Sequence, residues 1–403
     1  MERKPVDASD VVASGGELND DGEPIATPIE AELRQALEQA FLVGRMQGGA
    51  QDLAKVIAAF NERARPIAAA SHNPWTKHWS RISTNWLDNE PPKREWLLTR
   101  PESKDSKVDV GFFPCGKVGI LAAAGGTGKT MALIQLAIAV ATGTQWLGHY
   151  STPKSGRVLL ALGEEDAEEM QRRLFQAVKA LNVSTSARAH VMANIDVLPL
   201  AGESVAFVSK DARSGEVLEL PAIEQLREQL RAHVNDGQGH EPWRLIILDP
   251  LSRFAGPDSE TDNSAATRFV QSVESLTKAP GNPAVLLAHH TPKSARGKDT
   301  DSLDATVVRG SSALVDGVRW AATLLADSSS DSDATRTATL HLAKSNYTAP
   351  APKHQVKRGD YGVLLPLDDN DQAQAAQQRE NTRNATKSST SERPSNGPKS
   401  GGA

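Results

Sequence analysis

Short, nearly continuous apolar runs recur along the middle of the chain, and polar residues follow each of them. Four such runs have the length of a β-strand, at residues 118–121, 157–162, 243–248 and 284–288. Runs of this kind are typical of strands buried on both faces of a parallel sheet. Between them, apolar residues recur at helical spacing in residues 131–140 and 167–181. The alternation predicts an α/β fold with a mainly parallel central sheet.

Three of the predicted strands end in side chains that can do chemistry. These side chains are Glu164, Glu165 and Asp166 after the second run, Asp249 after the third, and His289 and His290 after the fourth. In an open parallel sheet, ligands bind beyond the carboxyl ends of the strands. We therefore expect these ends to surround one site. Strand alternation predicts that only one of the two histidines faces it.

The first run leads into AAAGGTGKT, residues 122–130, which is followed by a predicted helix. A loop with few side chains lets backbone N–H groups converge on a phosphate in front of the helix. Lys129 would reach the β and γ phosphates, and Thr130 would offer its hydroxyl to Mg²⁺. Ala123 stands where the GxxxxGK[ST] pattern begins with glycine. The predicted nucleotide-binding residues are Gly125, Gly126, Thr127, Gly128, Lys129, Thr130 and Met131.

The acidic residues divide into a candidate metal ligand and a candidate base. Asp249 has the form of a Walker B carboxylate, which holds Mg²⁺ directly or through water. The alternative for an aspartate at the end of a strand is a turn or a helix cap. Among residues 164–166, one acid would position an attacking water and the others would cap the next helix. The residue types alone leave that choice open, and a histidine after the fourth run would sense the γ-phosphate.

The chain after the fourth run predicts a loop, a helix and a strand. Residues 292–306 contain Arg296 and Lys298 and have no apolar periodicity, which predicts a long loop. RGSSALVDGVRW, residues 309–320, predicts a helix that carries Arg319, and Lys344 ends a late strand. Earlier, VAFVSKDARSGEVLEL alternates around a turn and predicts a β-hairpin.

Composition and charge limit the class of protein. The chain has 403 residues, 39% of them hydrophobic, and no apolar run approaches the length of a membrane span. The acidic N-terminus lacks the apolar segment of a secretory signal. A single cysteine, Cys115, excludes an internal disulfide framework. We predict a cytoplasmic protein without a membrane partner, and the net charge of −5 provides no general attraction to nucleic acid.

Changes in composition predict four segments along the chain. Residues 1–28 are rich in Gly, Pro, Asp and Ser and are predicted to be disordered. Residues 29–90 form a predicted helical N-terminal region, residues 91–367 the folded nucleotide-binding domain, and residues 368–403 a polar, disordered tail.

The order of AAAGGTGKT, LLALGEEDAEEMQRRL, LIILDPLSRF, LLAHHT and RGSSALVDGVRW resembles the hexameric replicative helicases of the plasmid RepA type. That group is a branch of the RecA-like P-loop ATPases related to the DnaB helicases, and the resemblance covers about residues 91–350. It implies a RecA-like fold, ATP and Mg²⁺ as cofactors, and hydrolysis at the subunit interfaces of a homo-hexameric ring. It also implies 5′ to 3′ movement on single-stranded DNA and a primase or initiator protein as a partner.

The resemblance also implies roles for single residues. Beside Lys129, it makes Glu165 the catalytic base, Asp249 the metal-binding aspartate, His290 the phosphate sensor and Arg319 a finger that reaches the neighbouring subunit's nucleotide. DnaB relatives carry a lysine and an arginine two residues apart at the end of a late strand. Here that run is Lys344-Ser345-Asn346, without the arginine, so Lys344 is a lesser candidate for the neighbour's nucleotide.

The predicted partner is single-stranded DNA, held by the loop after the fourth strand. We expect Arg296 and Lys298 to contact its backbone, because phosphate contacts come mostly from lysine and arginine. A solvated surface loop is the alternative. Two other functions remain open: a RecA-like ATPase that binds DNA in recombination or loading without unwinding it, and an NTPase with a protein client.

Overall fold

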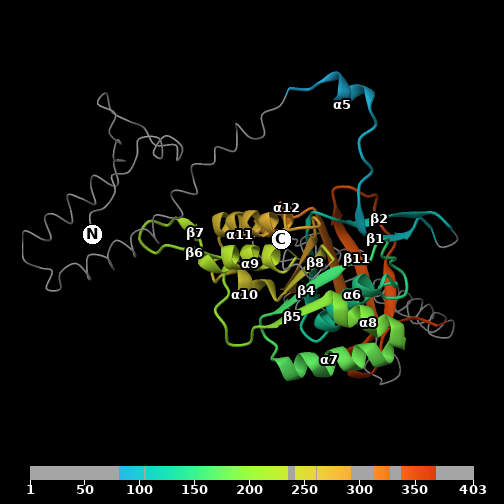
Figure 1. Ribbon diagram of the computed structural model, residues 1–403. Helices are drawn as coiled ribbons and strands as arrows, with labels where there is room; N and C mark the ends of the chain where they lie inside the picture. Colours follow the sequence, from blue (N-terminus) through green and yellow to red (C-terminus); the bar gives the residue numbers. More distant parts are fainter. Residues whose placement is uncertain are drawn as a thin grey trace, which may run out of the picture. The chain divides into compact units, whose positions relative to one another are not determined.

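The computed structural model describes residues 81–103, 106–234, 241–259, 261–291, 312–326 and 337–368 (Figure 1). The chain divides into two compact units, residues 1–91 and 92–403. Helix α5 (Thr84–Asp88) belongs to the first unit, and the sheets described below belong to the second. The predicted disorder of both termini and the helices expected in residues 29–80 lie outside the described residues. Within the described ranges, no helix combines the length and apolar character that crossing a membrane requires.

In the described part of the second unit, a nine-stranded sheet has the order β13-β12-β11-β10-β3-β9-β8-β4-β5. The parallel strands are β10 (Trp320–Ala326), β3 (Val118–Ala124), β9 (Ala284–Thr291), β8 (Trp243–Asp249), β4 (Arg157–Leu162) and β5 (Ile195–Pro199). The antiparallel strands at one edge are β11 (Thr337–Ser345), β12 (His354–Arg358) and β13 (Leu364–Pro366). The predicted α/β fold with a mainly parallel sheet is confirmed.

Helices cover both faces of this sheet, which explains why its central strands are apolar throughout (Figure 1). The helices of one face are α6 (Lys129–Thr142), α7 (Ala167–Ala180) and α8 (Thr185–Asn194). Those of the other face are α9 (Pro221–Ala232), α10 (Leu251–Ala255), α11 (Asn263–Leu276) and α12 (Ser312–Gly317). Successive residues of β8 alternate between the two clusters: Ile247 packs with the first group and Ile246 with the second.

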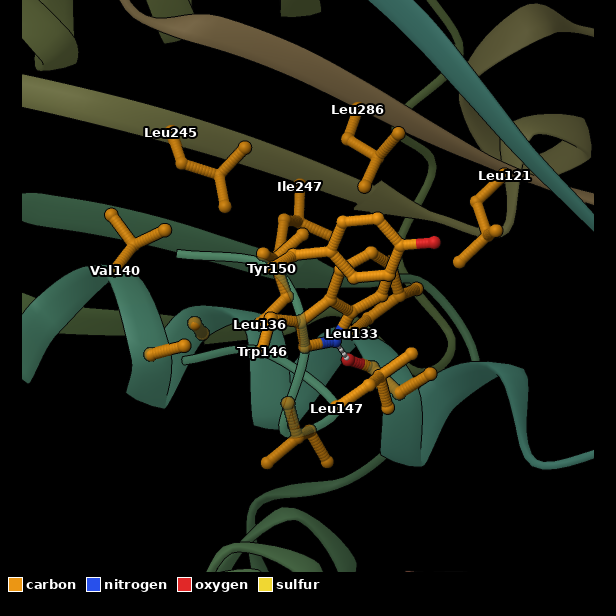
Figure 2. Close-up of a cluster of buried hydrophobic side chains, with 14 of the residues drawn as sticks. Leu121, Leu133, Leu136, Val140, Trp146, Leu147, Tyr150, Leu245, Ile247 and Leu286 are labelled. Carbon is orange, nitrogen blue, oxygen red and sulfur yellow. Dashed lines mark hydrogen bonds between the residues drawn. The ribbon is translucent and has the colours of Figure 1, made fainter. Parts of the chain in front are cut away.

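Helix α6 is almost entirely buried, which gives the loop before it a rigid support. Figure 2 shows Leu133, Leu136 and Val140 of this helix packed among side chains of the sheet and of residues 146–150. The indole N–H of Trp146 donates a hydrogen bond to the Ala132 carbonyl (2.9 Å). Because the side chains interlock on all sides, the N-terminus of α6 has little freedom to move.

Two small antiparallel sheets accompany the central one in the described residues. One pairs β1 (Trp96–Pro101) with β2 (Asp109–Pro114). The other pairs β6 (Val208–Lys210) with β7 (Val217–Glu219), which confirms the hairpin predicted from sequence. A short 3₁₀ helix, η5 (Asp360–Gly362), joins β12 to β13.

The helix predicted at residues 309–320 is shorter than expected. Helix α12 ends at Gly317, so the prediction that Arg319 lies on a helix was wrong. The Arg319 N–H donates to the Val118 carbonyl (3.1 Å), which starts the pairing of β10 with β3. Trp320 is buried and stacks on Phe113 with ring centroids 4.6 Å apart. Because burial of this indole places Arg319 and Trp320 beside β3, helix α12 ends at Gly317.

Candidate nucleotide site

The loop between β3 and α6 has the backbone of a phosphate-binding loop. Gly126 and Gly128 adopt φ angles of 79° and 103°, which favour glycine. Gly128 is the N-cap of α6, and as a glycine it has no side chain that could cap the first turn. The N–H groups at the start of α6 and the helix dipole therefore suit an anion. Thr127 is buried and donates to the Ala124 carbonyl (2.7 Å), which fixes the loop.

Asp249 holds the two polar side chains at the start of α6. Its Oδ1 forms an ion pair with Lys129 Nζ, and its Oδ2 accepts a hydrogen bond from Thr130 Oγ1 (2.8 Å). Lys129 and Asp249 are each only 5% exposed, so this pair is shielded from solvent. The Thr130 hydroxyl and the Asp249 carboxylate are the oxygen ligands that Mg²⁺ prefers, and they lie side by side. These residues therefore fit a magnesium site.

A cavity of about 560 Å³ opens in front of this loop, within the size range of small-molecule sites. It lies beyond the carboxyl ends of the parallel strands, where ligands of such sheets bind. Its lining residues are Ala124, Gly125, Gly126, Gly128, Lys129, Thr130, Met131, Glu165, Glu169, Arg172, Arg173, Gln176, His290, Arg358, Tyr361 and Gly362. The structure thus brings together side chains that the sequence carries far apart.

The three acids after β4 have different positions. Glu165 lines the cavity, and its Oε1 lies 2.9 Å from Arg173 Nη2. Asp166 caps helix α7 by accepting a hydrogen bond from the Glu169 N–H (2.7 Å). Glu164 lies 3.8 Å from Arg253 Nε. Only Glu165 of the three is therefore among the residues that line the cavity.

The environment of Glu165 changes its acidity. Partial burial raises its pKa above the usual glutamate value, and the charge of Arg173 opposes that shift. The negative charges of Glu169 and Asp249 act in the same direction as burial. A carboxylate with a raised pKa in a ligand cavity is a candidate general base.

Of the two histidines at the end of β9, only His290 lines the cavity. His289 is 3% exposed, as the alternation of strand side chains requires. Partial burial lowers the pKa of His290, and the nearby positive charge of Lys129 lowers it further. A lowered pKa favours the neutral imidazole, which can donate a hydrogen bond from one ring nitrogen.

Sequence reasoning missed a segment that we call the strap, residues 358–364. Arg358 Nη1 donates to the Gly126 carbonyl of the phosphate loop (2.6 Å), and Tyr361 and Gly362 line the cavity. Gln135 of α6 anchors the strap: its Nε2 donates to the Leu364 carbonyl (2.7 Å), and its Oε1 accepts from the Leu364 N–H (2.9 Å). No motif marks these residues, because the pairing of β12 with the edge strand β13 brings them to the loop.

Neither Arg319 nor Lys344 is among the residues that line the cavity. Trp320, the residue after Arg319, pairs with Gly119 in parallel register, whereas the phosphate loop follows Ala124. Arg319 is exposed, at the opposite end of β3 from the loop. Lys344 Nζ donates to the Val315 and Asp316 carbonyls (2.8 and 3.0 Å) at the end of α12.

Burial lowers the pKa of Lys344, and the charge of nearby Arg319 lowers it further. Asp316 opposes the shift. The predicted DNA contacts Arg296 and Lys298 lie outside the described residues.

A comparison with protein families matches residues 78–296 to the family described as AAA domain, more than half of the 403-residue chain. The chain belongs to this family. The predicted P-loop ATPase is thereby confirmed. The match takes in the phosphate loop, Glu165, Asp249 and His290, and it ends before Arg319 and the strap of this AAA-domain protein.

Among solved structures, one described as an ATPase domain matches with 15% identity and a TM-score of 0.45 over 64% of this chain and 87% of that chain. A structure of a DnaB-like replicative helicase, described with its interactions with primase, matches with 13% identity and a TM-score of 0.45. That match covers 63% of this AAA-domain chain and 58% of the other.

Proposed function

We propose that the protein hydrolyses ATP in this cavity with Mg²⁺ held by Thr130 and Asp249. The observation that carries the proposal is the convergence of Lys129, Asp249 and Glu165 at the carboxyl ends of three strands. The loop N–H groups and Lys129 bind the phosphates. Mg²⁺ held by Thr130 and Asp249 would supply positive charge that stabilises the phosphates.

The remaining site residues act on the attacking water and on the γ-phosphate. Glu165 takes the proton of the water as general base, a role that its raised pKa and its place in the cavity support. Neutral His290 donates a hydrogen bond to the γ-phosphate and so reports whether that phosphate is present.

Arg319 completes the site of another subunit in this proposal. Gly119, beside which β10 begins, lies five residue steps along β3 from Ala124, where the loop starts. At roughly 3.3 Å per residue this is about 17 Å, more than an extended arginine side chain spans. An exposed arginine so far from its own phosphate loop supports a role at an interface, where it stabilises transition-state charge. Lys344, bound to the end of α12 in its own subunit, stays a lesser candidate.

We further propose that the protein assembles as a homo-hexameric ring and moves on single-stranded DNA in the 5′ to 3′ direction as a replicative helicase. This rests on the order of the five motifs, which resembles the RepA-type helicases, and on the cations Arg296 and Lys298 after the strand that carries His290. A primase or initiator protein is the expected partner. A DNA-stimulated ATPase that does not separate strands is the second candidate.

The decisive experiment measures ATP hydrolysis with and without single-stranded DNA, strand separation on forked duplexes with either tail blocked, and particle mass. We expect a hexamer, DNA-stimulated hydrolysis and unwinding that requires a free 5′ tail. Lys129→Ala serves as the inactive control. Stimulation without strand separation would favour the recombination or loading function. Hydrolysis that DNA does not change would favour a protein client.

A further inference from the structure

The geometry points to Arg173 as the residue that positions the Glu165 carboxylate for proton abstraction. This inference rests on the proposed function, because it gives Glu165 the role of general base. Arg173 lies on helix α7 and lines the same cavity as Glu165. It does not carry out the chemical step itself; it acts through the carboxylate it holds.

Arg173 is held from two sides, which fixes the direction of its guanidinium group. Its Nη2 lies 2.9 Å from Glu165 Oε1, and its Nε donates to Glu169 Oε1 (2.9 Å) one helical turn earlier. A planar guanidinium with two carboxylate partners has few other orientations. Because Arg173 engages Oε1, Oε2 is the oxygen that would accept the proton of the attacking water.

The neighbouring arginine shows why the contact is specific to Arg173. Arg172 bonds Glu169 Oε2 (2.9 Å) and lies 3.4 Å from Glu168 Oε2, and its side chain is 61% exposed. The side chains of Arg173 and Glu165 are 31% and 18% exposed. The pair at Glu165 is thus the more shielded one, and partial shielding from water strengthens an ion pair.

Charge around Glu165 makes a cation there necessary. Glu165 faces or shares its cavity with charged and titratable groups from several elements: Glu164, Glu169, Arg172 and Arg173 on its own side, Asp249 from β8, His290 from β9, Lys129 from α6 and Arg358 from β12. Lys129 is already paired with Asp249. Arg173 is the cation that lowers the pKa of Glu165, against the burial and the carboxylates that raise it. Without it, both the orientation and the ionised form of the base would be less favoured.

The test replaces Arg173 in two backgrounds and measures steady-state ATP hydrolysis in the full-length chain. We expect Arg173→Gln to lower kcat about 10-fold or more, because misplacing a catalytic group by about an ångström is costly. The KM for ATP should change less than about threefold, since the phosphate loop is untouched. Arg173→Lys should recover part of kcat by restoring the charge. Arg231→Gln is the matched control, because it removes an exposed ion pair of helix α9, with Glu224, outside the cavity.

A double-mutant cycle separates positioning from a structural role. When Glu165→Gln is already present, Arg173→Gln should lower kcat further by less than about twofold, because the group it positions is gone. The inference would be overturned if Arg173→Gln lowered kcat by the same factor with Glu165 present and with Glu165→Gln. It would also be overturned if Arg173→Gln alone left kcat unchanged. If Glu165→Gln alone keeps the kcat of the unmodified protein, then the proposed base is wrong and the inference fails with it. That result is distinct from a failure of Arg173 alone.

Discussion

Replacing Gln135 with leucine removes both hydrogen bonds that hold the strap on helix α6. Gln135 is 2% exposed, and its side-chain amide pairs with the N–H and the carbonyl of Leu364, which is 0% exposed. Leucine nearly matches glutamine in volume but offers neither donor nor acceptor. The substitution therefore leaves two buried backbone groups without their partner.

The size of the effect follows from these two groups. Each buried backbone group left without a hydrogen bond costs roughly 1–3 kcal/mol, so the pair costs roughly 2–6 kcal/mol. Greater apolar burial of leucine offsets about 1–2 kcal/mol of this loss. Subtracting the offset leaves roughly 0–5 kcal/mol, so we expect local opening of the strap to become easier by a central value of about 2.5 kcal/mol, which corresponds to about 60-fold faster exchange at tenfold per 1.4 kcal/mol.

Hydrogen exchange of the Leu364 amide measures this opening directly, and ATP kinetics measure its functional consequence. We expect the KM for ATP to rise, because the strap carries Arg358 and Tyr361 to the cavity. Gln171→Leu, on the exposed side of α7, is the matched control. Unchanged protection of the Leu364 amide in Gln135→Leu would refute the role of Gln135 as the anchor.

Three further predictions concern the site. Lys129→Ala should abolish ATP hydrolysis, because the lysine neutralises phosphate charge, and should leave the far-ultraviolet circular dichroism unchanged. Normal turnover in this variant would show that residues 122–130 are not the phosphate-binding loop. Turnover should fall as the pH is lowered through the raised pKa of Glu165, because a general base must be ionised. In a plot of kcat against pH, the fall at acid pH should therefore lie above the ordinary range of glutamate pKa values. The same fall in Glu165→Gln would assign it to another group. Mixing Arg319→Ala subunits with Lys129→Ala subunits should recover some hydrolysis if Arg319 acts across an interface; mixed rings without recovery would place its action within one subunit.

The sequence predicted the centre of the sheet because burial on both faces leaves a clear pattern. The strands that became β3, β4, β8 and β9 are continuous apolar runs, and their helices cover both faces of the sheet. The N-cap role for one acid after β4 was also foreseen, and Asp166 fills it. The buried strands and the helix cap depend on residues that are close together in the sequence, so a single sequence is sufficient to predict them.

The strap could not be predicted, because its position depends on pairing between distant segments. Arg358 lies at the end of β12 and reaches Gly126 because β12 pairs with the edge strand β13 and Gln135 holds Leu364. The end of α12 was missed for a related reason. The contact that accompanies the end of this helix, between the Trp320 ring and Phe113, joins residues far apart in the sequence.

The strand that leads into the phosphate loop also has a consequence for biosynthesis. Strand β3 lies between β9 and β10, which begin only at Ala284 and Trp320. At roughly 5–20 residues per second, a ribosome needs on the order of ten seconds or more to deliver those neighbours. During that interval, an apolar segment with unpaired backbone groups leaves the exit tunnel without its partners. Chaperone supply during translation should therefore control the yield of this ATPase more than the stability of the finished fold does.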